Sequence, residues 1–172
     1  ACEEGLVSGY GDGRFGPDDP VTVGQAVTVV LRLLGYTAEE IGPFWPEDYL
    51  NKAVALGLLD GLPADGGAGL TRGDAALLLY RVLRQTDRDG QDYIDNLCAS
   101  KVTGAVLLDN NAEAADGTLG TVEVYANQTI NWYEPAEAVP DRLVGRKGAL
   151  LLDEEGKTVG FLPDDSSHRT LR

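Results

Sequence analysis

Two glycine-rich stretches decide how this chain folds. Residues 5–25 read Gly-Leu-Val-Ser-Gly-Tyr-Gly-Asp-Gly-Arg-Phe-Gly-Pro-Asp-Asp-Pro-Val-Thr-Val-Gly-Gln, and residues 57–74 read Gly-Leu-Leu-Asp-Gly-Leu-Pro-Ala-Asp-Gly-Gly-Ala-Gly-Leu-Thr-Arg-Gly-Asp. The two stretches align at an offset of about 50 residues, and each leads into an apolar run with helical spacing. Self-similarity at a fixed period is the signature of repeats, so the first half of the chain is predicted to contain two related units.

Apolar periodicity predicts the helices of these units. Helices are expected over residues 23–34 and 72–84, and another over 46–56 with Gly57 at its end. The predicted buried stripes are Ala26, Val27, Val30, Leu31 and Leu34 in one helix and Ala75, Leu78, Leu79, Val82 and Leu83 in another. The pairs Thr22–Gln25, Thr37–Glu40 and Thr71–Asp74 have the spacing of a helix-starting capping box.

The apolar period changes to two after residue 98. Strands are expected over residues 101–108, 119–126, 129–133, 147–152 and 157–162, with a hairpin turn at 153–156. The pattern predicts that Val102, Gly104, Val106 and Leu108 share one face, that Val122 and Val124 point inward, and that Leu150 and Leu152 share a face. Trp132 and Tyr133 point to opposite faces, one of them into the core. One end of this β-domain is expected to be plugged by Leu143, Val144 and Gly145.

The predicted fold class is α+β in two domains. The first domain spans residues 1–97, with a partial first repeat at about 1–36, a second repeat at 45–84 and a linker with a short helix at 85–97. The second domain spans residues 98–165 and is expected to be a small antiparallel β-barrel of the oligonucleotide/oligosaccharide-binding type, because a flat sheet of short strands cannot close a core. Residues 166–172 form a polar tail.

Charge and composition exclude several classes of function. The chain has 172 residues with 14 Lys+Arg against 28 Asp+Glu, a net charge of −14. Such an acidic surface repels phosphate backbones, so no nucleic acid is expected as a partner. No apolar run approaches the roughly 20 residues that a membrane-spanning helix needs.

The residues that carry metal and catalytic chemistry are scarce. Two cysteines and one histidine cannot supply a structural zinc site, and no cofactor is expected. His168 lies in a polar tail, which disfavours a catalytic triad, and the acidic run at 87–92 lacks the spacing of a calcium-binding EF-hand loop. Cys2 and Cys98 can pair or stay reduced. No carboxylate pair stands out as catalytic, so the chain is expected not to be an enzyme.

The repeats resemble the S-layer homology family, the wall-anchoring modules of bacterial surface proteins. The first repeat carries the family's Gly-Leu-Val-Ser-Gly-Tyr run with Gly9, then Asp12, Gly13, Phe15 and Pro17, and a helix led by Thr22. The second repeat carries Trp45, Gly57-Leu58-Leu59 and Leu70-Thr71-Arg72-Gly73-Asp74, which matches the family's Leu-Thr-Arg-Ala-Glu signature. The resemblance covers residues 1 to about 84, half of the chain.

This resemblance implies an extracellular wall protein that binds a secondary cell-wall polysaccharide bearing pyruvylated sugar ends, with other surface-layer subunits as further partners. The candidate glycan-binding residues are Arg72, Thr71, Asp74 and Trp45. An arginine at a helix N-terminus offers a planar fork and backbone N–H groups, which suit the carboxylate of a pyruvate ketal. For Trp45 a core position between the repeats is favoured over sugar stacking, and for Asp74 a capping role over direct binding.

The chain also departs from the family pattern. Val23 and Gln25 stand where the family has Arg and Glu, so the first repeat is not expected to grip a carboxylate in the same way. The family usually works with three repeats, and fewer than two are visible here. The alternative is therefore a structural spacer with degenerate repeats and no glycan affinity. An exposed Arg72 favours the anchor, and a buried or ion-paired Arg72 favours the spacer.

Overall fold

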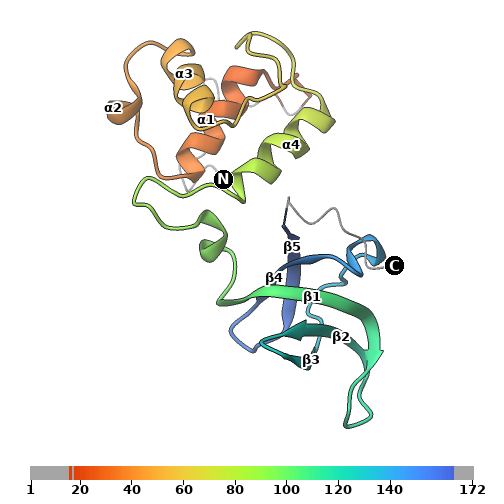
Figure 1. Cartoon of the computed structure of the whole chain (residues 1–172). Helices are drawn as coiled ribbons and strands as arrows, with labels where there is room; N and C mark the ends of the chain where they lie inside the picture. The colour runs from red at the N-terminus through yellow and green to blue at the C-terminus, as the bar shows by residue number, and fades with distance from the viewer. Residues whose placement is uncertain (1–15, 17, 165–172) are drawn as a thin grey trace. The chain divides into compact units, whose positions relative to one another are not determined.

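The chain divides into two compact units in a computed structural model that describes residue 16 and residues 18–164 (Figure 1). The first unit ends at Ile94 and the second begins at Asp95. The first unit is helical and the second is built on one antiparallel sheet, which confirms the α+β class. The two units are described separately below.

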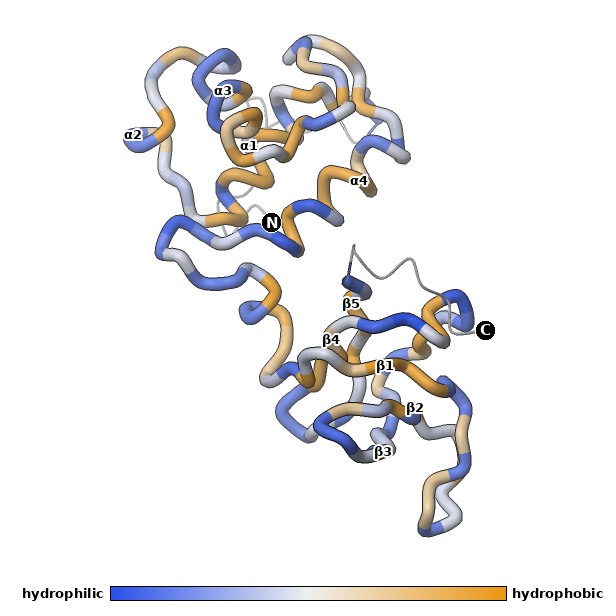
Figure 2. Tube along the Cα trace, in the orientation of Figure 1, coloured by the Kyte–Doolittle hydropathy of each residue, from blue (hydrophilic) through white to orange (hydrophobic). Residues whose placement is uncertain are grey.

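The first unit contains the predicted helices, with bounds that differ by one or two residues from the expected ones. The helices are α1 (Val23–Leu33), α2 (Ala38–Ile41), α3 (Glu47–Ala55) and α4 (Arg72–Val82). A polar stretch follows α4, blue in Figure 2, and leads into the 3₁₀ turn η1 (Tyr93–Asn96).

The helix ends follow the local chemistry of the sequence. Capping boxes are present at the starts of α1, α2 and α4, as predicted from the three threonine pairs. Gly35 and Gly57 follow α1 and α3 with φ of 83° and 69°, a left-handed conformation that favours glycine. The amides of these glycines and of the next residues bond back into the last turn, so both helices end in a Schellman motif.

The segments that precede α1 and α4 pair with each other. Thr22 and Gly69 form an antiparallel bridge, and the Leu70 N–H donates to the Val21 carbonyl at 2.8 Å. The Val23 N–H donates to the carbonyl of Ala68 at 2.9 Å. Corresponding parts of the two repeats are thus joined through their backbones.

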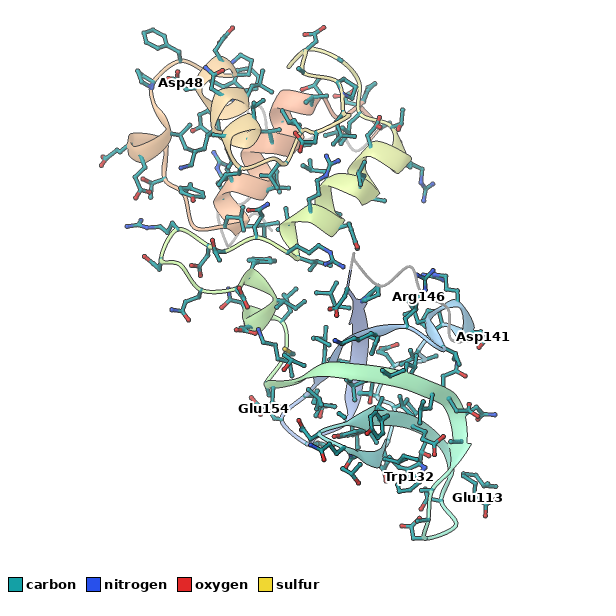
Figure 3. All side chains as sticks on the ribbon, in the orientation of Figure 1. Asp48, Glu113, Trp132, Asp141, Arg146 and Glu154 are labelled. Atoms are coloured by element: carbon teal, nitrogen blue, oxygen red, sulfur yellow. The ribbon has the colours of Figure 1, made fainter. Side chains whose placement is uncertain are left out.

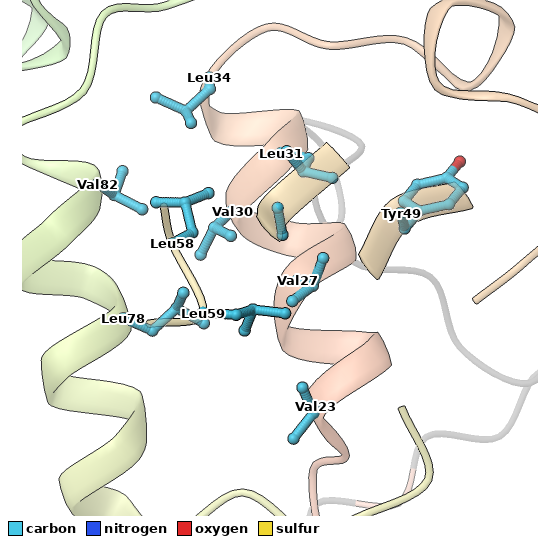
Figure 4. Packing of buried hydrophobic residues seen from close by; sticks show 11 residues of the cluster. Val23, Val27, Val30, Leu31, Leu34, Tyr49, Leu58, Leu59, Leu78 and Val82 are labelled. Atoms are coloured by element: carbon cyan, nitrogen blue, oxygen red, sulfur yellow. The ribbon is translucent and has the colours of Figure 1, made fainter. Parts of the chain in front are cut away.

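The helical core is centred on α1. Figure 4 shows Leu58 and Leu59 lying between α1 and α4. The fully or nearly buried residues are Val23, Val27, Val30, Leu31, Leu34, Tyr49, Ala53, Leu58, Leu59, Leu78 and Val82. The predicted burial of Leu79 is wrong: this side chain is 52% exposed, because α4 buries only the face that carries Leu78 and Val82.

The second unit is a five-stranded antiparallel sheet with the strand order β3-β2-β1-β4-β5. Its strands are β1 (Ser100–Glu113), β2 (Leu119–Ala126), β3 (Thr129–Tyr133), β4 (Lys147–Leu152) and β5 (Thr158–Pro163), and a 3₁₀ turn η2 (Asp141–Leu143) precedes β4. The predicted bounds of β2, β3 and β4 are confirmed, while β1 is longer than expected.

The sheet is open, so the predicted closed barrel is not confirmed. The strands β3 and β5 lie at the two edges and form no ladder with each other. A single parallel bridge joins Pro135, just after β3, to Thr158 at the start of β5. The Thr158 N–H donates to the Glu134 carbonyl at 2.8 Å, and the Ala136 N–H donates to the Thr158 carbonyl at 2.9 Å. The two edges therefore meet only at one end.

The predicted alternation in β1 is wrong at one point. Ala105 and Leu107 are fully buried, whereas Val106 and Leu108 are only partly buried. Between Val102 and Ala105 the register with β4 shifts, and Gly104 has a φ of 66°. A left-handed glycine with one extra residue is a β-bulge, and it moves the following side chains to the opposite face.

The remaining predictions for the faces of the sheet are confirmed. Val122 and Val124 are fully buried, and Leu150 and Leu152 belong to the same buried cluster. Leu143 packs against this cluster, as expected of a residue that plugs one end. The prediction is wrong for Val144, which is 38% exposed because it follows the turn η2 with its side chain outside the cluster.

Candidate functional site

The strongest candidate site lies at the start of α4. Thr71 and Asp74 cap this helix reciprocally: the Asp74 N–H donates to Thr71 Oγ1 at 3.1 Å, and the Thr71 N–H donates to Asp74 Oδ2 at 3.2 Å. The Thr71 hydroxyl also donates to Asp74 Oδ2, at 2.6 Å. The backbone N–H and the carboxylate of Asp74 therefore both bond to Thr71, which confirms the predicted capping role.

Arg72 is the first residue of α4 and is exposed to solvent. Within the described part of the chain, its guanidinium makes no ion pair or hydrogen bond. The amides of Arg72 and Gly73 likewise have no acceptor among the described residues, whereas those of Asp74 and Ala75 bond to Thr71. The helix start thus offers two backbone N–H groups beside a positively charged fork.

The start of α1 differs although its capping box is the same. The Val23 N–H donates to the Ala68 carbonyl at 2.9 Å, and the Gly24 N–H donates to the Gly66 carbonyl at 3.0 Å. The next two amides bond to Thr22, so all four amides of the first turn of α1 are occupied. Sequence reasoning did not identify this difference, because it arises from the loop at 66–68 of the other repeat.

The chemistry of the α4 start suits an anion. Unpaired N–H groups and the helix dipole favour negative charge, and a guanidinium binds a carboxylate through two parallel bonds. The same features are missing at α1, where Val23 replaces the arginine and the amides already have acceptors.

Trp45 does not occupy the core position that was favoured for it. Its side chain is 55% exposed, so the core prediction is wrong. The indole Nε1–H donates to Thr28 Oγ1 at 3.0 Å, and Thr28 in turn donates to the Gly24 carbonyl at 2.8 Å. The edge of the ring lies against Gly24, where a Cβ atom would be 3.6 Å from Trp45 Cζ2. These contacts hold the indole on α1.

Several motif residues lie outside the described part of the chain. Gly9, Asp12, Gly13 and Pro17 belong to this group, as do Cys2 and His168. The predicted alternatives for Cys2 and Cys98, paired or reduced, therefore also lie outside the described residues. The Cys98 thiol is half-buried, and burial, followed by the charge of Asp95, raises its pKa.

The second unit has an acidic groove of about 620 Å³ beside the β4–β5 hairpin. It is lined by Glu134, Pro135, Ala136, Asp153, Glu154, Glu155 and Lys157, and Figure 3 labels Glu154 at the hairpin tip. Lys157 pairs with Glu155 at 2.8 Å, and this partner raises the lysine pKa. Asp153 Oδ1 accepts the amides of Glu155 and Lys157, so this carboxylate shapes the turn.

Among the described residues, no group of three or more His, Cys, Asp or Glu side chains is placed to hold a metal ion. In the acidic run after α4, Asp87 Oδ1 accepts the amides of Asp89 and Gln91, at 3.0 and 2.9 Å. This carboxylate stabilises a turn, the same role that Asp153 has in the hairpin.

The adjacent aromatic residues of β3 separate as predicted. Tyr133 packs against the buried cluster, so Trp132 lies on the other face. On that outer face Tyr125 and Ile130 stand directly opposite each other, 45% and 42% exposed.

The helices of the described residues are all too short or too polar to span a membrane.

Comparison with known proteins places these observations in a family. The sequence profile of the S-layer homology domain matches residues 1–27. The chain is 32% identical over 157 residues to a cell surface protein of Thermoanaerobacter kivui, a match that covers 91% of this chain and 17% of that protein. No solved structure matches the chain.

Two further relatives have similar names. The chain is 36% identical over 84 residues to the middle cell wall protein of Brevibacillus brevis, covering 49% of this chain and 8% of that protein. It is 36% identical over 62 residues to the surface layer protein of Brevibacillus choshinensis, covering 36% of this chain and 6% of that protein. The chain thus spans less than a fifth of the length of these relatives. Family and relatives together assign it to the extracellular cell wall.

Proposed function

We propose that this chain, which belongs to the S-layer homology family, binds a secondary cell-wall polysaccharide through the start of α4 and so anchors a surface protein to the wall. The ligand group is a carboxylate, of the kind that a pyruvate ketal places on a sugar. Arg72 is its cation, and the amides of Arg72 and Gly73 are its backbone donors. Thr71 and Asp74 hold the helix start in position.

The observation that carries this proposal is the contrast between the two helix starts. Both have a threonine-led capping box, yet only α4 combines an arginine with amides that have no acceptor in the described part of the chain. The positive end of the helix dipole disfavours a cation, so helix stability does not explain an arginine as the first residue of α4, whereas an anionic ligand does. The first repeat, whose amides are already bonded, is proposed to act as a scaffold for the second.

The second unit is proposed to be a non-catalytic accessory domain. The match to the Thermoanaerobacter kivui protein is longer than either unit, so it includes parts of both. The acidic groove beside the hairpin repels a carboxylated polymer, which argues against a second site of the same kind. A role in spacing, or in contact with other surface-layer subunits, fits these features.

The test is Arg72→Ala in a binding assay with purified wall polysaccharide. Loss of one or two charge-assisted bonds is expected to weaken binding by about 1.5–3 kcal/mol each. Arg72→Lys is expected to weaken it less, because the charge remains and only the planar fork is lost. The matched control is Arg142→Ala, which removes an exposed arginine from the second unit.

The spacer alternative makes the opposite prediction. It requires either that the unaltered chain does not bind the polymer, or that Arg72→Ala binds as tightly as the unaltered chain. Either result would overturn the anchor proposal, and circular dichroism of both variants would show that the fold is intact.

A further inference from the structure

Two neighbouring aromatic side chains stand in solvent on the loop before α3. Phe44 is 70% exposed and Trp45 is 55% exposed. A single exposed apolar side chain is ordinary on a protein surface, but two large rings in succession expose considerable apolar area to water. The arrangement therefore calls for a reason beyond packing.

The backbone that carries these rings is held firmly. The Phe44 N–H donates to Asp48 Oδ2 at 2.9 Å, and the Phe44 carbonyl accepts from the Asp48 N–H at 2.8 Å. The Asp48 carboxylate, labelled in Figure 3, also lies so close to Gly42 that a Cβ atom there would clash with it. The exposed Phe44 is thus fixed at its backbone on both sides.

The next two residues attach the loop to α1. The Trp45 indole N–H points to Thr28, so its polar atom is used and the exposed part of the ring is apolar. Pro46 packs between Gly24 and Gly66, where added Cβ atoms would lie 3.0 and 2.9 Å from its ring atoms. A ligand of this loop must therefore present apolar surface to the rings.

The charges around the loop define the ligand further. Glu47 and Asp48 follow directly in the first turn of α3. The nearest basic residues are Lys52, in the last turn of α3, and Arg88, which pairs with Glu40 of α2 at 3.3 Å. These carboxylates disfavour an anionic group here, in contrast to Arg72 at α4. The C–H faces of uncharged sugar rings meet both conditions, since they are apolar and carry no charge.

We propose that Phe44 and Trp45 stack on uncharged sugar rings of the polymer whose carboxylate binds at Arg72. This inference rests on the proposed function and extends it with a separate, charge-independent subsite. Phe44 is the residue that tests it, because its side chain is 70% exposed and its substitution removes little buried surface.

The experiment is calorimetric titration with wall polysaccharide from Thermoanaerobacter kivui, and with the same polymer after its carboxyl groups are reduced to alcohols. Phe44→Ala is expected to bind both polymers about fivefold more weakly, the loss of one aromatic contact. Phe44→Tyr is expected to restore binding. Arg72→Ala is expected to weaken binding of the native polymer only. Val54→Ala removes a 55% exposed apolar side chain of α3 and is the matched control.

The outcomes separate the two proposals. If Phe44→Ala binds both polymers like the unaltered chain, the stacking subsite is refuted and the anchor proposal stands. If Phe44→Ala weakens binding only of the native polymer, the contribution of the Phe44 ring depends on the carboxylate of the polymer. The inference of a charge-independent subsite is then wrong. If the unaltered chain binds neither polymer, both proposals fail together.

Discussion

At the scale of single residues, the helical unit depends on two glycines that leave room for one proline. A Cβ atom on Gly24 would lie 3.0 Å from Pro46 Cβ and 3.1 Å from the Gly66 carbonyl. A Cβ atom on Gly66 would lie 2.9 Å from Pro46 Cγ and 3.0 Å from Leu50 Cδ1. The rigid proline ring cannot move aside, so these positions admit only glycine without a shift of the backbone.

Gly66→Ala is therefore expected to destabilise the helical unit by about 1–3 kcal/mol, the usual cost of overpacking. Urea unfolding followed by circular dichroism measures this change. Gly69→Ala is the matched control in the same loop, because nothing lies within 4 Å of its added Cβ. Equal stability of the two variants would show that the backbone at 66–69 can shift without loss of stability, and that the contact between Gly66 and Pro46 does not require a glycine.

The same scale shows which part of the candidate site the sequence could predict. The capping of α4 by Thr71 and Asp74 follows from a local spacing of three residues, and it is confirmed. The occupied amides of α1 depend on carbonyls of Gly66 and Ala68, more than 40 residues away, so no local pattern reveals them. The core prediction for Trp45 is wrong because it rests on the general tendency of large apolar side chains to be buried, and this side chain is 55% exposed.

At the scale of elements, β1 shows how one residue changes an entire face. Simple alternation from Val102 predicts Val106 inside, but the bulge at Gly104 places Ala105 and Leu107 there instead. Period-two alternation locates a strand well, and the bounds of β2, β3 and β4 followed from it. It cannot locate a bulge, since a bulge depends on the register with the neighbouring strand.

Gly104→Val is expected to destabilise the sheet unit by at least about 1–2 kcal/mol, because a left-handed φ crowds a Cβ atom and a β-branched side chain worsens the crowding. Gly104→Asn is expected to cost less, since asparagine tolerates this conformation better. Urea unfolding of the two variants measures their free energies of unfolding and shows which substitution destabilises the sheet unit more.

Gly160→Ala in β5 supplies the control for this series. Its φ is not left-handed, and its added Cβ would lie 3.7 Å from Leu151 Cδ1, an ordinary contact. If Gly104→Val were as stable as Gly160→Ala, the bulge would not require a glycine and the explanation for the shifted face would be wrong.

The edges of the sheet mark the limit of prediction at this scale. Five short strands predict curvature, but whether the edge strands pair depends on long-range geometry. Here β3 and β5 meet only at the bridge between Pro135 and Thr158. Proline lacks a backbone N–H, so Pro135 cannot donate in a ladder that would extend this contact.

At the scale of the whole molecule, each unit contains its own apolar cluster. Leu78 belongs to the helical cluster and is 1% exposed, while Leu150 belongs to the sheet cluster and is 0% exposed. A unit with its own core satisfies the main requirement of an independent domain. We therefore propose that the two units unfold separately.

Hydrogen exchange of the full chain measures this independence. Leu78→Ala and Leu150→Ala are each expected to cost about 2–5 kcal/mol through the cavity they leave. Leu78→Ala should speed the exchange of amides in α1 and α4 and leave β1 and β4 unchanged, and Leu150→Ala should do the reverse. In the double variant the two costs should add within about 0.5 kcal/mol, as expected for sites that share no partners. Faster exchange in both units from either single substitution would mean that the two units unfold together as one cooperative body. The boundary near Ile94 would then separate two compact units that are not independently stable.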